Sequence, residues 1–145
     1  MSINSMKNQD HAEREYTRRW RKKWFKDRKV TEIDGDLVLD KNETYDGDLF
    51  VYGNIYGDHK YSLRVNNGHL AADNIYVSDL IVPNGNIAAE DISANTIKTK
   101  RLYSDGDIKA QRIDANEIIA EKTIDAKDIS TYKIYVDKNR QKLKA

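Results

Sequence analysis

Residues 70–136 read LAADNIYVSDLIVPNGNIAAEDISANTIKTKRLYSDGDIKAQRIDANEIIAEKTIDAKDISTYKIYV. A large aliphatic residue returns every five to seven positions throughout this stretch: Leu70, Ile75, Leu80, Ile87, Ile92, Ile97, Leu102, Ile108, Ile113, Ile118, Ile124, Ile129 and Ile134. A period of five fits neither a helix nor a long alternating strand, but it suits a short strand followed by a corner, with residues i and i+2 facing inward. Because such self-similarity is typical of repeat proteins, we predict a parallel β-solenoid.

The number of strands per coil follows from stacking this series in threes. The first column is then Leu70, Ile87, Leu102, Ile118 and Ile134, the second Ile75, Ile92, Ile108 and Ile124, and the third Leu80, Ile97, Ile113 and Ile129. Two inward columns at i+2 become mostly small: Ala72, Ala89, Ser104, Ala120 and Val136, and Val77, Ala94, Ala110 and Ala126. We therefore expect an all-β, three-sided parallel β-helix of about 16 residues per coil. A four-sided coil is the weaker alternative, and the pattern leaves the handedness open.

The 145 residues make one domain at most, and their charge is unevenly distributed. Residues 1–30 carry a net charge of +6, residues 31–137 a net charge of −9, and the tail from Lys138 a net charge of +4. We expect a disordered segment at 1–9, a basic amphipathic helix at 10–29, the solenoid at 30–137 and a polar tail at 138–145. The chain has no cysteine, no apolar run long enough to span a bilayer and no signal-peptide core, which favours the cytoplasm.

The head has helical character because it lacks Gly and Pro and places Ala12, Tyr16, Trp20 and Trp24 on one stripe. Basic residues fill much of the remainder, including Arg18, Arg19, Arg21, Lys22 and Lys23. Such a helix can cap an open end of the solenoid. The alternatives are contact with a membrane surface, with nucleic-acid phosphates or with a protein partner.

The segment between the head and the regular series is less uniform. Gly and Asp mark corners in residues 30–57, and we expect residues 58–67 to form a loop. Pro83 lies in the one seven-residue step, where a corner can absorb an inserted residue. We also expect His59 and His69 to be solvated loop residues.

No catalytic constellation, nucleotide-binding glycine loop or metal-ligand spacing is recognisable in the chain. We therefore expect no enzyme activity, no metal site and no cofactor.

Two surface features stand out instead. At position i+3 of the first column the residues are all acidic: Asp73, Glu90, Asp105, Glu121 and Asp137. This acidic ladder is either a solvated corner or a docking site for a basic partner. Next to it, the outward i+1 column becomes apolar toward its end, at Tyr103, Ile119 and Tyr135, and predicts either an interface or a stiffening ladder.

Residues 46–57, DGDLFVYGNIYG, resemble a repeat of the bactofilins, polymer-forming cytoskeletal proteins of bacteria. Weaker echoes occur at Asp105–Ile108 and at Asn84–Ile87. The resemblance implies a right-handed, three-sided β-helix that assembles end to end without nucleotide, often with a membrane-contacting N-terminal segment. The spacing is also similar to that of pentapeptide-repeat proteins, some of which mimic DNA, but there the small residue lies two positions before the central one.

Two functions follow as hypotheses. The first is a structural or scaffold protein whose solenoid self-associates or presents a face to a protein partner. The second is a small inhibitor or adaptor, of the phage or mobile-element type, whose acidic face mimics nucleic acid and occupies a basic groove. Nucleic-acid or membrane binding through the basic head is a further possibility.

Overall fold

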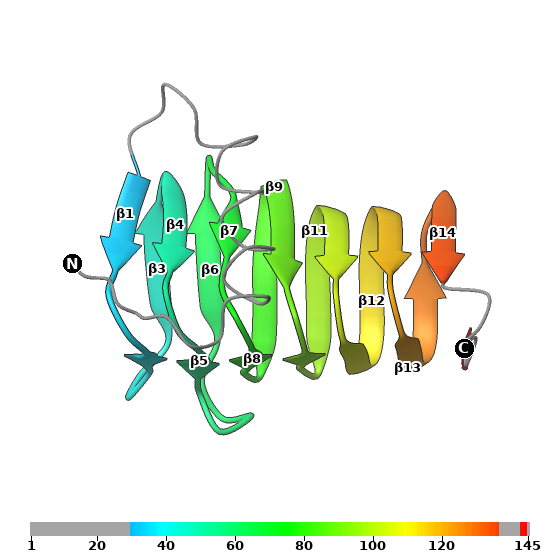
Figure 1. Ribbon diagram of the computed structural model, residues 1–145, viewed down its shortest axis with the longest axis horizontal. Helices are drawn as coiled ribbons and strands as arrows, with labels where there is room; N and C mark the ends of the chain where they lie inside the picture. Colours follow the sequence, from blue (N-terminus) through cyan, green and yellow to red (C-terminus); the bar gives the residue numbers. More distant parts are fainter. Residues whose placement is uncertain (1–29, 137–142, 145) are drawn as a thin grey trace.

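The computed structural model describes residues 30–136 and 143–144, and Figure 1 shows them as a rod of stacked coils. All the described strands belong to one continuous parallel system. The predicted helix at 10–29, with Tyr16, Trp20, Trp24 and its basic residues, lies outside the described residues, and so does Asp137.

Each coil has three sides, which we call side A, side B and side C. Side A stacks β1 (Val30–Ile33), β4 (Asp48–Val51), β7 (Leu70–Ala71), the ends of β9 (Asp79–Ala89), β11 (Thr96–Ser104) and β12 (Asp107–Ala120), and β14 (Lys133–Val136). Side B stacks β2 (Leu37–Val38), β5 (Ile55–Tyr56), β8 (Ile75–Tyr76), β10 (Ile92–Ser93), the starts of β12 and β13 (Thr123–Ser130), and β15 (Leu143–Lys144). Side C stacks β3 (Glu43–Asp46), β6 (Leu63–Asn66), the starts of β9 and β11, the middle of β12 and the end of β13.

The register confirms the three predicted columns. Leu70 pairs with Ile87, Ile75 with Ile92, and Leu80 with Ile97, and the same columns continue to the last coil. The three-sided parallel solenoid with coils of about 16 residues is therefore confirmed. Seven strands on side A, spaced by about 4.8 Å, give a rod about 29 Å long.

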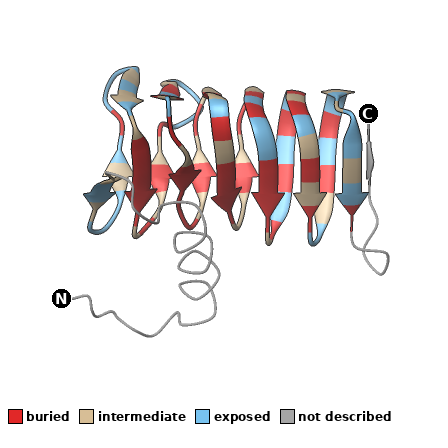
Figure 2. Ribbon diagram, turned by 90° about the horizontal axis from the view of Figure 1, so that it is seen from above, coloured by how far each residue is buried: buried red, intermediate tan, exposed pale blue. Residues whose placement is uncertain are grey.

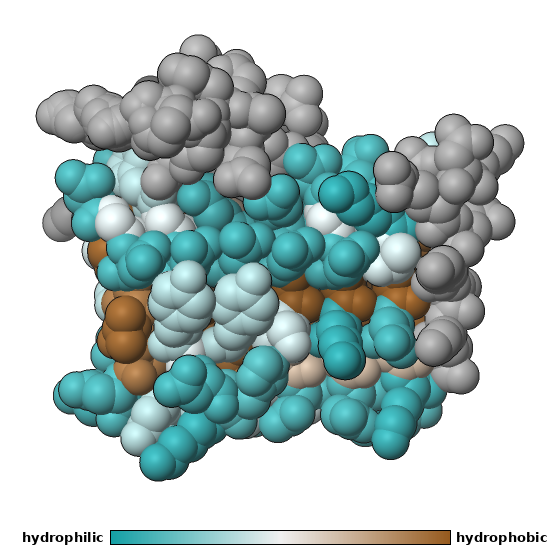
Figure 3. Space-filling model, turned by 60° about the horizontal axis from the view of Figure 1, so that its bottom comes forward, coloured by the Kyte–Doolittle hydropathy of each residue, from teal (hydrophilic) through white to brown (hydrophobic). Residues whose placement is uncertain are grey.

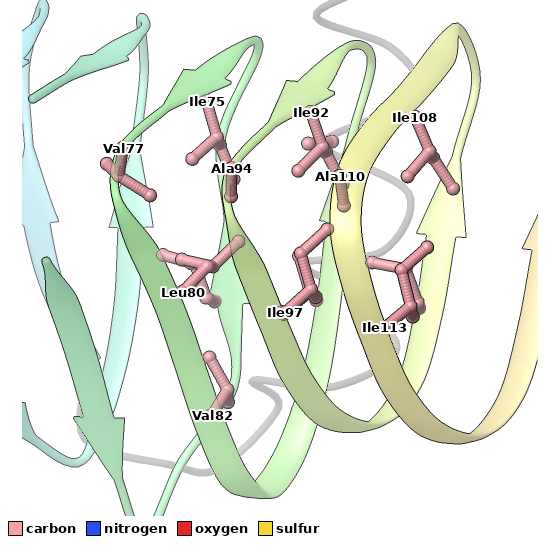
Figure 4. Close-up of a cluster of buried hydrophobic side chains, with 14 of the residues drawn as sticks. Ile75, Val77, Leu80, Val82, Ile92, Ala94, Ile97, Ile108, Ala110 and Ile113 are labelled. Carbon is pink, nitrogen blue, oxygen red and sulfur yellow. The ribbon is translucent and has the colours of Figure 1, made fainter. Parts of the chain in front are cut away.

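The core is a set of aliphatic ladders inside the coils (Figure 4). Ile75, Ile92 and Ile108 stack as one ladder, and the i+2 residues Ala94 and Ala110 sit beside them in the interior. Both predicted small columns are buried throughout. Figure 2 shows buried positions recurring along the strands in coil after coil. The short repeat thus encodes a continuous core because every coil places the same positions inward.

The predicted loop at 58–67 is only partly correct. The loop ends before Leu63, and Leu63 and Val65 are buried inside β6. Asp58 and His59 have left-handed φ angles of 55° and 56° and form the turn that inserts the extra residues. The alternation of Leu63 and Val65 is the strand signal that overrides the polar composition of this segment.

The seven-residue step at Pro83 predicts an insertion absorbed at a corner, and the structure places this insertion as a bulge within β9. Val82 pairs with Thr99 and Asn86 with Arg101, so three residues of β9 face a single residue of β11. The Thr99 hydroxyl donates a hydrogen bond of 2.8 Å to the Gly85 carbonyl and fixes the bulge. A Cβ atom at Gly85 would collide with the backbone of Gly68 in the coil below, so the bulge requires glycine.

Candidate interaction surfaces

The acidic ladder lies at the corner between sides A and B. The Glu90 N–H donates to the Asp73 carbonyl at 2.6 Å, so these two residues stack directly. The next coil has one more residue in this corner, and Gly106, not Asp105, donates to the Glu90 carbonyl, at 2.8 Å. The Asp105 N–H donates to the Ala89 carbonyl at 3.0 Å and the Glu121 N–H to the Ser104 carbonyl at 2.9 Å. Because Ala89, Ser104 and Ala120 are register partners, Asp105 and Glu121 continue the ladder in line with Glu90.

The exposure of the side chains changes along the acidic ladder. Asp73 is buried, Glu90 and Asp105 are half-buried, and Glu121 is exposed. A surface that mimics nucleic acid needs several accessible carboxylates in a row. Of the four ladder residues within the described part of the chain, only Glu121 is exposed.

The predicted apolar strip lies on side A, and its exposure is also graded. Tyr103 is buried at 8 % exposure, Ile119 is half-buried and Tyr135 is 54 % exposed. The column extends toward the N-terminus through Ala88, Ala71 and Phe50, in register with Tyr103. We call these six residues the side A strip. Phe50, Ala71, Ala88 and Tyr103 form a hydrophobic cluster separate from the core.

A stacked aromatic pair occurs on side B. The rings of Tyr56 and Tyr76 lie 5.7 Å apart with planes 10° from parallel. Figure 3, in which the bottom of Figure 1 comes forward, shows a mainly hydrophilic surface with small hydrophobic areas. Burial raises the pKa of the Tyr76 hydroxyl, and the nearby carboxylate of Asp91 raises it further.

A second polar ladder was not recognised as such in the sequence. An Asp or Asn lies directly before the inward aliphatic residue of side B in successive coils. Its side-chain Oδ1 accepts a hydrogen bond from the backbone N–H of the residue at the same position in the next coil, at 2.8 to 3.1 Å. The members are Asp36, Asn54, Asn74, Asp91 and Asp107, and the Thr123 hydroxyl donates to Asp107 at the end. The Asp or Asn that often precedes the repeated aliphatic residue was its signal. We call this row the side-chain ladder.

Opposite charges face each other across the later coils. Lys98 pairs with Asp114 and Lys109 with Asp125. Arg101 forms a salt bridge with Glu117, with 3.2 Å between Nε and Oε1. Residues of opposite charge are thus neighbours across adjacent coils, which is favourable for the pairing of their strands.

The two histidines of the body are placed differently. His59 is exposed, as expected, and its Nε2 lies 2.7 Å from Ser93 Oγ beside a shallow hollow on side B lined by Lys109 and Asp125. His69 contradicts the expectation of a solvated loop. It is half-buried, and its backbone N–H donates to Asp48 Oδ1 at 2.8 Å. Its ring Nδ1 accepts a hydrogen bond from the backbone N–H of Asn86 at 2.9 Å.

Within residues 30–136 and 143–144, no group of three or more His, Cys, Asp or Glu side chains is arranged to hold a metal ion. In the same part of the chain there is no helix with the length and apolar character needed to cross a membrane. No protein-family model matches the chain, and no curated protein or solved structure matches it.

Proposed function

We propose that this protein is a non-enzymatic scaffold whose solenoid associates end to end with further copies of itself. The observation that carries the proposal is the position of the exposed apolar side chains. Among the described residues, the exposed large hydrophobics are Val38 at 66 %, Tyr132 at 92 % and Tyr135 at 54 %. Val38 lies in the first coil and the two tyrosines in the last. Exposed apolar surface therefore concentrates at the two ends of the rod, where a partner would add.

The open sheet edges support the same proposal. Among the described strands, β1, β2 and β3 have a partner on one side only, and β14 has one only toward β12. An edge strand presents backbone donors and acceptors that another chain can pair with. All the strands are parallel, so the two ends of the rod differ and only a head-to-tail contact continues the ladders. Such heterologous contacts produce open filaments unless the rotation closes them into a ring.

The resemblance of residues 46–57 to bactofilin repeats, whose family polymerises end to end, points the same way. The nucleic-acid mimic is the less favoured alternative because Asp73 is buried and Glu90 and Asp105 are only partly exposed.

The test blocks one end at a time. The backbone N–H of Glu43 donates to the Ser62 carbonyl in the next coil. Because backbone groups of successive residues in a strand point in opposite directions, the N–H and carbonyl of Thr44 point toward the open end. Thr44→Pro removes that donor and is tolerated at an edge. The double variant Tyr132→Lys with Tyr135→Lys places charge at the other end. Thr44→Val and Tyr132→Phe are the matched controls, because they keep the donor and the apolar ring.

Light scattering after size-exclusion chromatography measures the assembly. We expect concentration-dependent assemblies for the wild type and both controls, and monomers for each blocked variant alone. An equimolar mixture of the two blocked variants should give dimers and nothing larger, because one open end of each kind remains. A wild-type protein that is monomeric at every concentration and salt, or blocked variants that assemble like their controls, would refute the proposal.

A further inference from the structure

The side A strip contains side chains that point out of the coil and are nevertheless buried. Phe50, Ala71, Ala88 and Tyr103 have exposed fractions of 2 %, 0 %, 0 % and 8 %. They follow the inward residues Leu49, Leu70, Ile87 and Leu102, so the alternation of a strand directs them away from the core. An outward side chain on a single-layered sheet contacts solvent unless something covers it.

Side B of the same coils shows what an uncovered outward column looks like. Its corresponding residues are Tyr56, Tyr76, Ser93 and Lys109, which are half-buried or exposed. The far end of the side A strip also behaves in this way, because Tyr135 is 54 % exposed. Of these two outward columns, only the one on side A is buried, and only in the coils from β4 to β11.

The strands between Val30 and Val136 do not provide this cover. All of them form the coil itself, and none constitutes a second layer over side A. The C-terminal residues Leu143 and Lys144 pair with β13 on side B. The segment that precedes Val30 is then the remaining part of the chain long enough to cover the strip, and Val30 begins on side A itself.

We propose that residues 10–28 dock in cis along the side A strip, with Tyr16, Trp20 and Trp24 against the apolar residues. A helix of 19 residues is about 28 Å long, which matches the length of the rod. This proposal concerns the same chain and does not depend on assembly between copies.

Charge complementarity supports the same arrangement. The acidic ladder lies two positions beyond the strip, about 7 Å away along the strand. In a helical segment, Arg19, Lys22 and Lys26 follow one another at spacings of three and four and so share one flank of the aromatic stripe. When the stripe lies on Ala71 and Ala88, that flank can face Asp73 and Glu90, the ladder residues of the same two coils.

Docking along side A differs from the predicted cap. A cap would cover the edges of β1, β2 and β3, whereas a segment on side A leaves these edges accessible. The N-terminal segment then shields an apolar face without blocking the end of the rod.

The two tryptophans make this testable in the full chain, because both lie in the segment and the body has none. We expect Trp emission to be blue-shifted and protected from acrylamide relative to a synthetic peptide of residues 10–28. Ala88→Lys places charge under the docked segment but points outward, so the coil should still form. It should shift the emission to the red and restore quenching to the level of the peptide.

Ser93→Lys is the matched control, since it introduces the same charge at the equivalent outward position of side B in the same coil and should leave the Trp emission unchanged. Circular dichroism confirms that both variants fold. Wild-type Trp residues as accessible as those of the peptide would overturn the proposal, and so would protection that survives Ala88→Lys. Protection that disappears on dilution would assign the strip to the segment of another copy and overturn docking in cis.

Discussion

At the scale of single residues, the solenoid relies on two kinds of ladder. The aliphatic ladders bury their side chains almost completely in the middle coils, and the side-chain ladder of Asp and Asn satisfies backbone N–H groups at the corner where the chain turns into side B. The corner N–H groups on this ladder donate to side-chain oxygens of the neighbouring coil. The polar residue before each aliphatic residue therefore has a structural role of its own.

Asn74 tests the side-chain ladder because it lies in its middle. Its Oδ1 accepts the Asp91 N–H at 3.0 Å. We expect Asn74→Ala to lower the free energy of unfolding by about 1 kcal/mol, since the Asp91 N–H loses its acceptor. Asn74→Asp keeps an acceptor oxygen and should be nearly neutral. Urea denaturation of the three proteins measures the difference, and equal losses for Ala and Asp would contradict the assignment.

Two tyrosines predict how stability changes at high pH. Burial raises the pKa of Tyr45, and Glu43, which accepts a hydrogen bond of 3.2 Å from its hydroxyl, raises it further; the pKa of Tyr76 is raised mainly by burial. A raised pKa means that the unfolded chain ionises first. The contribution of these residues is therefore complete below the ordinary tyrosine pKa of about 10 and is lost as the pH rises above it.

We expect the melting temperature to fall more steeply above about pH 10 in the wild type than in the double variant Tyr45→Phe with Tyr76→Phe. Tyr132→Phe, at an exposed position of the last coil, is the control and should keep the wild-type slope. Parallel slopes for all three proteins would show that these hydroxyls do not couple to folding.

At the scale of elements, register decides which charges meet. The strands of side B place Lys109 opposite Asp125, and those of side C place Lys98 opposite Asp114. In a parallel ladder a shift by one residue would exchange inward and outward positions, so these pairs and the aliphatic columns must be satisfied by the same register.

A charge swap between β12 and β13 tests the pairing. Lys109→Asp places two carboxylates in adjacent coils and should destabilise the protein by about 0.2–1 kcal/mol. Adding Asp125→Lys restores opposite charges in the reverse order and should recover most of the loss. A double-mutant cycle at low salt measures the coupling, which should diminish in high salt. Additive effects of the two substitutions would indicate that the pair does not interact.

At the scale of the whole molecule, the rod is a one-dimensional stack in which most coils have neighbours on both sides. Ile92, Ile97 and Ile108 in the middle are almost completely buried, whereas Leu37 in the first coil and Ile134 in the last are half-buried. The free energy of folding of such a stack is approximately the sum of the intrinsic stability of each coil and the stability of each interface between neighbouring coils. The terminal coils therefore open more readily than the middle ones, which is also what makes them available to another copy.

Native-state hydrogen exchange tests this gradient. We expect the slowest exchange in amides of β9–β12 and the fastest in β1–β3 and β14, because opening an end breaks fewer contacts between coils. Measured under dilute, monomeric conditions, the gradient should be present at both ends. Raising the protein concentration should slow exchange at the ends if copies associate there, while the middle amides serve as an internal control. Uniform protection along the rod would contradict the gradient.

The sequence by itself determined the coil. The repeated aliphatic residue and the small residue two positions later define which positions face inward. Stacking the series in threes places small residues above small ones, which favoured three sides over four. The step lengths also revealed the insertion near Pro83, since an extra residue must leave the ladder somewhere, and the structure showed that it is a bulge.

Tertiary structure alone decided what happens outside the core. The strand β6 that begins at Leu63 forms because β3 of the preceding coil is there to pair with it. The burial of Ala71 and Ala88 depends on what lies over side A. Inward positions follow a local period, whereas outward positions are set by contacts between residues distant in the chain, which periodicity does not encode.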